Sequence, residues 1–310
     1  MRKKAALLLL IFALAISFIS CADSTASAPS INRKLLPVSN GPGVTYGLYN
    51  MDGEIETTKH FEIGSGDVFE EIFSFGSMID VERTYKLLVF ANYAQVDFSV
   101  DNDPAAGSFD FTTAAQEHVQ HTIKVSGLKD GFYDLLLLVV KDPYNDSLDE
   151  EYRKQTELSH MVSMRYSLQV GTEDGLTLDH DFKVYENVAD TTLSRVFLNN
   201  QRDLMRLLVL DCNQADQPEL YLHIGNSSAQ SKNYASFLLY DWEQAPIGEN
   251  DVLYSSVPSS SRMVLPFKLQ TVGAKGVHNL TAVCVEAPYH KASIEDALPT
   301  ISNRIGIKVS

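Results

Sequence analysis

The sequence has few of the features that announce a reaction. It contains three cysteines and one tryptophan in 310 residues. It has no Walker loop, no G-x-G-x-x-G turn, no G-x-S-x-G elbow and no H-E-x-x-H pair, so no motif indicates a nucleotide site, a hydrolase nucleophile or a zinc helix. Two carboxylates placed for glycoside hydrolysis cannot be picked out from 40 acidic residues. We therefore expect a non-catalytic protein without a cofactor.

Positive charge is also scarce. The chain has 25 Lys and Arg against 40 Asp and Glu, which gives a formal net charge of −15. A surface of this sign disfavours nucleic acid, because phosphates require Lys and Arg for neutralisation. It also repels anionic lipid headgroups, so attachment to a membrane would have to come from a lipid anchor.

Only one long apolar run is present, and it lies at the N-terminus. Three basic residues at positions 2–4 precede the run at residues 5–19. A run of this length fits a secretory signal peptide and is shorter than the ~20 residues that a spanning helix needs. It ends at Phe18-Ile19-Ser20-Cys21, which resembles a bacterial lipobox. The resemblance implies removal of residues 1–20, lipidation of Cys21, and a place in the bacterial cell envelope facing the periplasm or the exterior.

The next segment predicts a tether. Residues 22–43 are rich in Ala, Ser, Pro and Gly, a composition typical of flexible linkers. Together with the lipidated residue, we place the tether at 21–43. The remaining length is enough for two domains of ordinary size.

Blocks of the remaining chain recur in the same order in two halves. The matched segments are 60–63 with 181–184, 87–90 with 207–210, 95–102 with 219–226, 131–144 with 276–289, and 165–170 with 304–309. This order predicts an internal duplication with a boundary near residues 171–175. We therefore expect one domain at 44–172 and a second at 173–310.

Each half predicts an all-β fold. Residues 97–100 and 220–224 alternate in side-chain character, as half-buried strands do. Residues 135–140 form a continuous apolar run, which is typical of a central buried strand. Leu128 to Tyr133 resembles the L-x-x-G-x-Y turn of immunoglobulin-like domains, and His278 stands at the tyrosine position of the second half. The predicted fold is two tandem immunoglobulin-like antiparallel β-sandwiches.

The two halves differ between residues 228 and 258, which we interpret as an insertion in the second domain. It carries Tyr240, Trp242 and Tyr254. One interpretation is an extra strand pair with Trp242 in the core. The other is an exposed binding surface, because tyrosine and tryptophan make large contacts at low entropic cost.

Two weaker candidate sites remain open. Cys212 and Cys284 could close a disulfide in an exported protein, or they could be two buried thiols. Asp97, Asp101 and Asp103 lie near a strand end and are weak calcium candidates, because Ca²⁺ takes clustered carboxylate oxygens. Acidic runs are more often solvated loops, so we expect no metal.

These observations favour a lipid-anchored envelope protein that binds another macromolecule, with an envelope or extracellular protein as partner. The first alternative is a carbohydrate-binding lipoprotein, which requires an exposed, flat Trp242 or a nearby tyrosine. The second is a hydrolase assembled from distant residues, which requires a deep pocket with paired carboxylates or a Ser/His pair.

Overall fold

The computed structural model describes residues 43–154, 161–172, 180–190, 192–193, 195–270 and 274–310. By contacts the chain divides into residues 1–33 and a second compact unit, residues 34–310, which contains every described residue. The predicted signal peptide, Cys21 and the predicted tether up to residue 42 lie outside the described residues. Within the described ranges, no helix is both long and apolar enough to span a bilayer.

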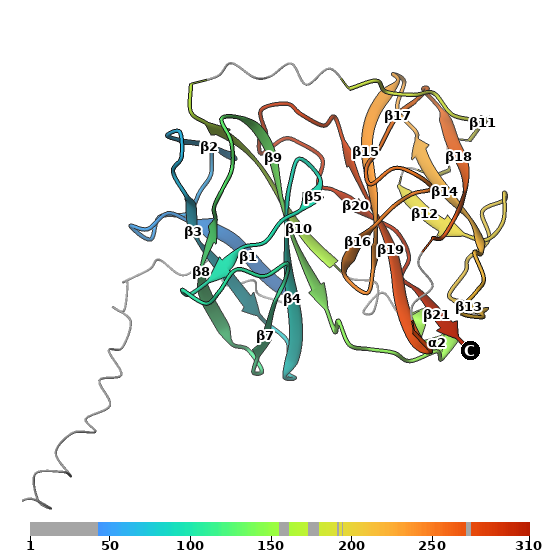
Figure 1. The fold of residues 1–310 in the computed structure, drawn as a ribbon, viewed down its shortest axis with the longest axis horizontal. Helices are drawn as coiled ribbons and strands as arrows, with labels where there is room; N and C mark the ends of the chain where they lie inside the picture. The colour runs from blue at the N-terminus through green and yellow to red at the C-terminus, as the bar shows by residue number, and fades with distance from the viewer. Residues whose placement is uncertain (1–42, 155–160, 173–179, 191, 194, 271–273) are drawn as a thin grey trace, which may run out of the picture. The chain divides into compact units, whose positions relative to one another are not determined.

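The first sandwich is built from residues 44–170 (Figure 1). Its strands are β1 Val44–Tyr49, β2 His60–Ile63, β3 Phe69–Ser77, β4 Arg83–Ala91, β5 Ala94–Gln95, β6 Ser99–Val100, β7 Phe109–Thr113, β8 His118–Val125, β9 Gly131–Lys141 and β10 Met161–Val170; a one-turn helix, α2, spans Glu150–Arg153. The first outer sheet has the order β1-β3-β8-β6. The first inner sheet has the order β2-β10-β9-β4-β5, with β7 also beside β4. Its pairs are antiparallel except β2 with β10.

The second sandwich follows the same plan in residues 187–309. Its strands are β11 Asn187–Ala189, β12 Val196–Asn199, β13 Val209–Cys212, β14 Glu219–Asn226, β15 Lys232–Tyr240, β16 Glu243–Ala245, β17 Leu253–Val257, β18 Ser261–Lys268, β19 Gly276–Glu286, β20 Thr300–Ile301 and β21 Ile305–Val309. The second outer sheet is β11-β18-β14-β12, and the second inner sheet is β13-β21-β19-β15-β16, with β17 and β20 at its sides. Here β13 with β21 is the parallel pair. The expected pair of immunoglobulin-like sandwiches is confirmed.

The sheet order confirms two of the sequence matches. β9 and β19 occupy the same central place and each has eleven residues. Each begins at a glycine with positive φ, +145° at Gly131 and +149° at Gly276, a conformation that favours glycine. β10 and β21 also occupy equivalent places, which aligns Arg165 with Arg304.

Three other matches are wrong. By place in the sheets, β4 corresponds to β15 rather than to residues 207–210, which overlap β13. β14, at 219–226, corresponds to β3 rather than to 95–102, and β2 corresponds to β13 rather than to 181–184. Short apolar strands resemble one another in composition, so order within the sheets is needed to pair them.

The predicted insertion at 228–258 is also wrong. Residues 232–240 form β15, the counterpart of β4 beside the central strand of the inner sheet. β16 and β17 both pair with β15, as β5 and β7 both pair with β4. The apparent difference in length arises because the sequence match aligns β14 with the wrong part of the first half.

Three hydrophobic clusters hold the unit together. Each sandwich has a core between its own two sheets, and a third cluster joins the two inner sheets. In β9 the residues facing the first core alternate with those facing the third cluster: Leu135, Leu137 and Val139 against Leu136, Leu138 and Val140. The inner strands are therefore buried on both faces, which explains why this run is continuously apolar.

The turn before each central strand is closed in the same way. The Tyr133 hydroxyl donates to the Lys129 carbonyl and accepts from the Lys129 N–H, both at 3.0 Å. In the second sandwich His278 Nε2 lies 2.7 Å from the carbonyl oxygen of Ala274, also four residues upstream. The histidine therefore closes the turn in place of the tyrosine.

Candidate functional site

The two sandwiches meet through the same elements on each side. The N–H of Gln95 donates to Gln244 Oε1 and the N–H of Gln244 donates to Gln95 Oε1, each at 2.8 Å. Each glutamine follows a two-residue hairpin turn with positive φ at both residues: Asn92 and Tyr93 in the first, Asp241 and Trp242 in the second. Equivalent residues that bond to each other in both directions are typical of an isologous contact, like that between the subunits of a two-fold dimer.

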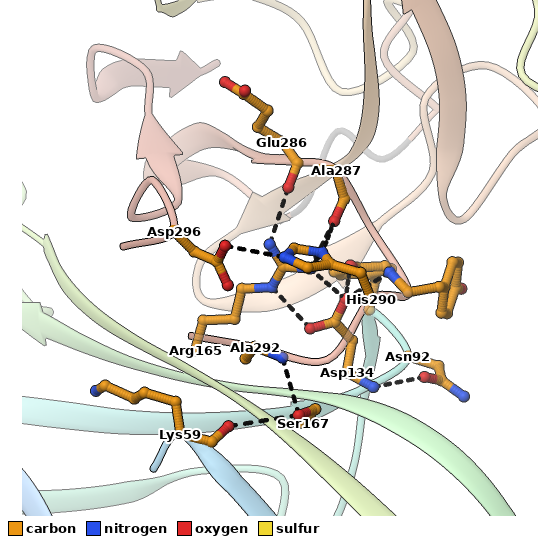
Figure 2. A network of polar contacts seen from close by, with 12 residues as sticks. Lys59, Asn92, Asp134, Arg165, Ser167, Glu286, Ala287, His290, Ala292 and Asp296 are labelled. Carbon is orange, nitrogen blue, oxygen red and sulfur yellow. Dashed lines mark hydrogen bonds and ion pairs between the residues drawn. The ribbon is translucent and has the colours of Figure 1, made fainter. Parts of the chain in front are cut away.

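A buried ion pair forms the polar centre of this contact (Figure 2). Arg165 donates from Nε to Asp134 Oδ1 at 2.8 Å and from Nη2 to Asp134 Oδ2 at 2.7 Å. The guanidinium also reaches the second sandwich, at the carbonyl oxygens of Glu286 and Ala287, both at 2.8 Å. Burial lowers the pKa of Arg165, but its bonds to Asp134 outweigh burial and leave the pKa raised. The arginine is therefore a permanent cation that locks the two sandwiches together.

The equivalent position in the second sandwich lacks a carboxylate. Arg304 Nε donates to Asn279 Oδ1 at 2.9 Å, and its other nitrogens reach the carbonyl oxygens of Lys141 and Asp142 at 3.2 and 3.0 Å. Arg153 Nη1 lies 3.4 Å from the same amide oxygen, and its buried Nη2 has no hydrogen-bond partner among the described residues. Burial and the charge of Arg153 lower the pKa of Arg304 to about 10. The contact is thus two-fold in geometry but asymmetric in charge.

Trp242 and Tyr254 lie at this contact, whereas Tyr240 belongs to the core of the second sandwich. Trp242 is 5% exposed. Its Nε1–H donates to the Pro143 carbonyl at 2.7 Å, and the Arg304 guanidinium lies 4.6 Å from its ring centroid. Tyr240 is buried, and the part-buried Tyr254 hydroxyl lies 2.5 Å from that of Tyr289. Exposed aromatic side chains at Trp242 and Tyr240 are therefore contradicted, because Trp242 packs in the contact between sandwiches and Tyr240 packs in a core.

The two cysteines are free thiols, and both are buried. Cys212 pairs with Val309 across β13 and β21, and Val309 pairs with Gly276 across β21 and β19. Cys284 lies eight residues further along β19, which is about 27 Å of strand. A disulfide requires Cα atoms within about 7 Å, so these cysteines cannot be joined. Burial raises the pKa of the Cys284 thiol to about 12, which keeps it protonated.

The acidic candidates at Asp97, Asp101 and Asp103 are exposed. Asp101 is already engaged, because its Oδ1 accepts from the Thr122 N–H at 2.8 Å and its Oδ2 lies 2.7 Å from His121 Nδ1. Within the described ranges, no three His, Cys, Asp or Glu side chains are grouped so that they could hold a metal ion.

One arrangement has the residue types of a hydrolytic triad. Ser167 Oγ lies 2.9 Å from His60 Nδ1, and His60 Nε2 lies 3.2 Å from Glu62 Oε1. Ser167, however, has no exposed surface. Its oxygen also accepts from the Ala292 N–H at 3.0 Å and donates to the Lys59 carbonyl at 3.4 Å. Figure 2 shows Ser167 held between Lys59 and Ala292. A nucleophile must reach a substrate, so this serine is a structural residue.

A second buried polar network lies in the second outer sheet, and no sequence signal pointed to it. His223 has no exposed surface; its Nδ1 accepts from Arg262 Nη1 at 2.6 Å and its Nε2–H donates to Asn199 Oδ1 at 3.0 Å. Arg262 also pairs with Asp190 Oδ2 at 2.9 Å. Burial and the Arg262 charge lower the pKa of His223 to about 4, so the imidazole is neutral at pH 7.

No family model and no curated protein matches this chain. Solved structures with partial similarity include a CARDB domain from Pyrococcus furiosus in complex with di-metal ions, at 12% identity over 44% of this chain and 100% of that chain. A family 123 glycoside hydrolase from Clostridium perfringens matches at 11% identity over 41% of this chain and 27% of its own. The Salmonella enterica SafA pilin in complex with the SafB chaperone matches at 11% identity over 85% of this chain and 97% of that chain. All three TM-scores are 0.26, so the fold assignment rests on the sheet topology alone.

Proposed function

We propose that this chain is a lipid-anchored protein of the bacterial cell envelope that binds another macromolecule without catalysing a reaction. The observation that carries the proposal is the N-terminal sequence, in which a basic start, an apolar run and a lipobox-like end precede Cys21. The first strand of the folded body begins at Val44, so the tether predicted at 21–43 would join the lipid to it.

The state of the buried polar groups supports recognition rather than chemistry. Asp134 and Arg165 bond to each other and to backbone, and the serine of the triad-like arrangement is inaccessible. A small cavity beside Cys284 has a volume of about 30 Å³, room for about one water molecule. The depression beside Cys212 is open to solvent. Of the two aromatic features that the carbohydrate alternative allowed, an exposed Trp242 or a nearby exposed tyrosine, burial removes Trp242.

The test is cross-linking capture from native cells with the full-length protein tagged at Ser310. A Cys21→Ala variant is the matched control, because it removes only the lipid attachment site. We expect the wild type in the membrane fraction with one specific partner in near-equal amount, and loss of both features in the variant. Equal membrane retention of the variant would contradict the anchor. Retention without any specific protein would contradict the protein-binding role and favour a glycan or small ligand.

A further inference from the structure

Two exposed loops occupy equivalent places in the two sandwiches and differ in net charge, which is −3 in the first (Asp52, Glu54 and Glu56) and +1 in the second (Arg202, Asp203 and Arg206). The acidic loop, residues 50–56, follows β1, and the basic loop, residues 200–206, follows β12. β1 and β12 each form an edge of an outer sheet beside its partner, β3 or β14. Each loop is organised by an asparagine where the strand ends, Asn50 in the first sandwich and Asn199 in the second.

The acidic loop is braced and presents apolar side chains. Asn50 Oδ1 accepts from the N–H groups of Asp52 at 3.1 Å and Glu54 at 2.9 Å. Met51 is 45% exposed and Ile55 is 44% exposed. With Glu56, the loop has three carboxylates and no basic residue. One acid of this loop acts on a neighbour, since burial and then the charges of Glu56 and of Glu70 in β3 raise the pKa of Glu71 to about 8.

The basic loop is braced more deeply. Asn199, which has no exposed surface, donates from Nδ2 to the carbonyl oxygens of Asp203 at 2.6 Å and Met205 at 3.1 Å. The buried His223 bonds to the side chain of Asn199 and is itself bonded to Arg262, so this network fixes the position of the asparagine. A buried network of this kind lowers the cost of ordering a binding loop before its partner arrives.

The exposed surface of the basic loop complements that of the acidic loop. Met205 is 57% exposed and Leu204 is 37% exposed. Asp203 and Arg206 flank them, and Arg202 precedes Asp203, so the loop has two guanidiniums and one carboxylate. Arg202 pairs with Glu186 through both Nη1 and Nη2, and both side chains are about half exposed. A docked carboxylate would therefore share or replace Glu186 as the partner of this guanidinium. Methionine and arginine are enriched in protein interfaces.

We propose that the partner of each loop is a second copy of this chain, with the acidic loop of one copy docked on the basic loop of the next. Apolar side chains would pack at the centre, and carboxylates would meet guanidiniums around them. Both loops leave outer sheets, and the two inner sheets lie between those sheets. In Figure 1 the loop after β1, in blue, and the loop after β12, in yellow, lie on opposite sides of the unit. The loops of one chain therefore pair with loops of other chains.

The resulting contact is heterologous, because two different surfaces meet. Each added copy leaves one unused loop of each kind, so the array extends head to tail unless its rotation closes a ring. This inference deepens the proposed function, on which it rests, by naming the chain itself as a macromolecule that it binds.

Site-specific cross-linking in native membranes tests the contact. The full-length chain carries Met51→Cys and Met205→Cys and is treated with a short bismaleimide. The native thiols Cys212 and Cys284 are buried and serve as internal unreactive positions. We expect a ladder of dimers, trimers and longer species. A control chain with Val81→Cys and Val184→Cys, two exposed valines outside both loops, should give no ladder.

Charge reversal then tests the complementarity. Asp52→Lys with Glu54→Lys, and separately Arg202→Glu with Arg206→Glu, should each reduce the ladder about tenfold or more, the loss expected when a docked charge pair becomes repulsive. Co-expression of the two reversed chains should restore cross-linking, because each then meets the opposite charge. Near-ultraviolet circular dichroism of each variant checks that the fold is intact.

Three results would overturn the proposal: no ladder from the wild-type pair of positions, an equal ladder from the control valines, or no rescue on co-expression. If the chain forms no ladder but is membrane-anchored and captures a different protein, the proposed function would still stand. A chain that forms the ladder without membrane attachment would contradict the anchor and leave the loop contact standing.

Discussion

The buried histidine beneath the basic loop makes the stability of the second sandwich dependent on pH. His223 accepts from Arg262, so its imidazole is neutral in the folded state, with a pKa of about 4 against an ordinary value of 6.5. The unfolded chain takes up the proton between these values and the folded chain does not. The neutral, buried imidazole therefore stabilises the folded state fully above pH 6.5, and this contribution to the unfolding free energy is lost as the pH falls toward 4. The difference between a pKa of 6.5 and one of about 4 corresponds to about 3 kcal/mol of unfolding free energy.

Urea unfolding at several pH values between 4 and 7.5, followed by Trp242 fluorescence, measures this loss. His223→Gln is the matched control, because an amide can accept from Arg262 and donate to Asn199 without titrating. His278 acts in the opposite direction: burial lowers its pKa, but its bond to Asp241 outweighs burial and raises it. This effect is common to both proteins. The wild type should lose about 3 kcal/mol more than the variant on acidification, and equal slopes would refute the reasoning.

Further predictions concern the charged contact and the cysteines. Asp134→Asn leaves the buried Arg165 without its counter-ion and should cost about 3–5 kcal/mol in urea unfolding; an unchanged midpoint would contradict the locking role. Asn279→Asp places a carboxylate against the two guanidiniums of the second sandwich and should raise the midpoint, whereas a lower midpoint would count against the charge asymmetry. Cys212 and Cys284 should react with a thiol reagent only after unfolding, and a peptide linking them in a non-reducing digest would exclude the strand order β13-β21-β19.

The sequence predicted the fold class because alternation and turn residues are local properties. The matches around β9 and β19, and around β10 and β21, were correct for a further reason. These strands carry residues that the contact between sandwiches constrains in both copies: glycines at positive φ, and the pair Arg165 and Arg304 that cross to the other sandwich. The other strands lack such constrained residues and have similar apolar compositions, so sequence matches between them were wrong.

The sequence contains one indication of the contact between the two sandwiches, but the prediction attributed it to a central position within one sandwich. The continuous apolar run 135–140 indicates burial on both faces of a strand, whereas an antiparallel sheet with one solvated face alternates. The second buried face is the other sandwich, where Phe90 and Phe237 meet with ring centroids 4.7 Å apart. Burial of Trp242 follows from the same contact and from its hairpin turn.

The His223 network and the loop above it could not be predicted. Asn199, His223 and Arg262 come from three strands and meet only through the register of β12, β14 and β18. A lone histidine in a strand gives no indication that it is buried or neutral. The equivalence of the acidic and basic loops likewise depends on the corrected strand order.

The proposed role depends most directly on lipidation, and mass spectrometry of the protein extracted from membranes tests it. We predict a mature N-terminus at Cys21 that carries a thioether-linked lipid, with residues 1–20 absent. An unmodified N-terminus at any other residue would contradict the anchor.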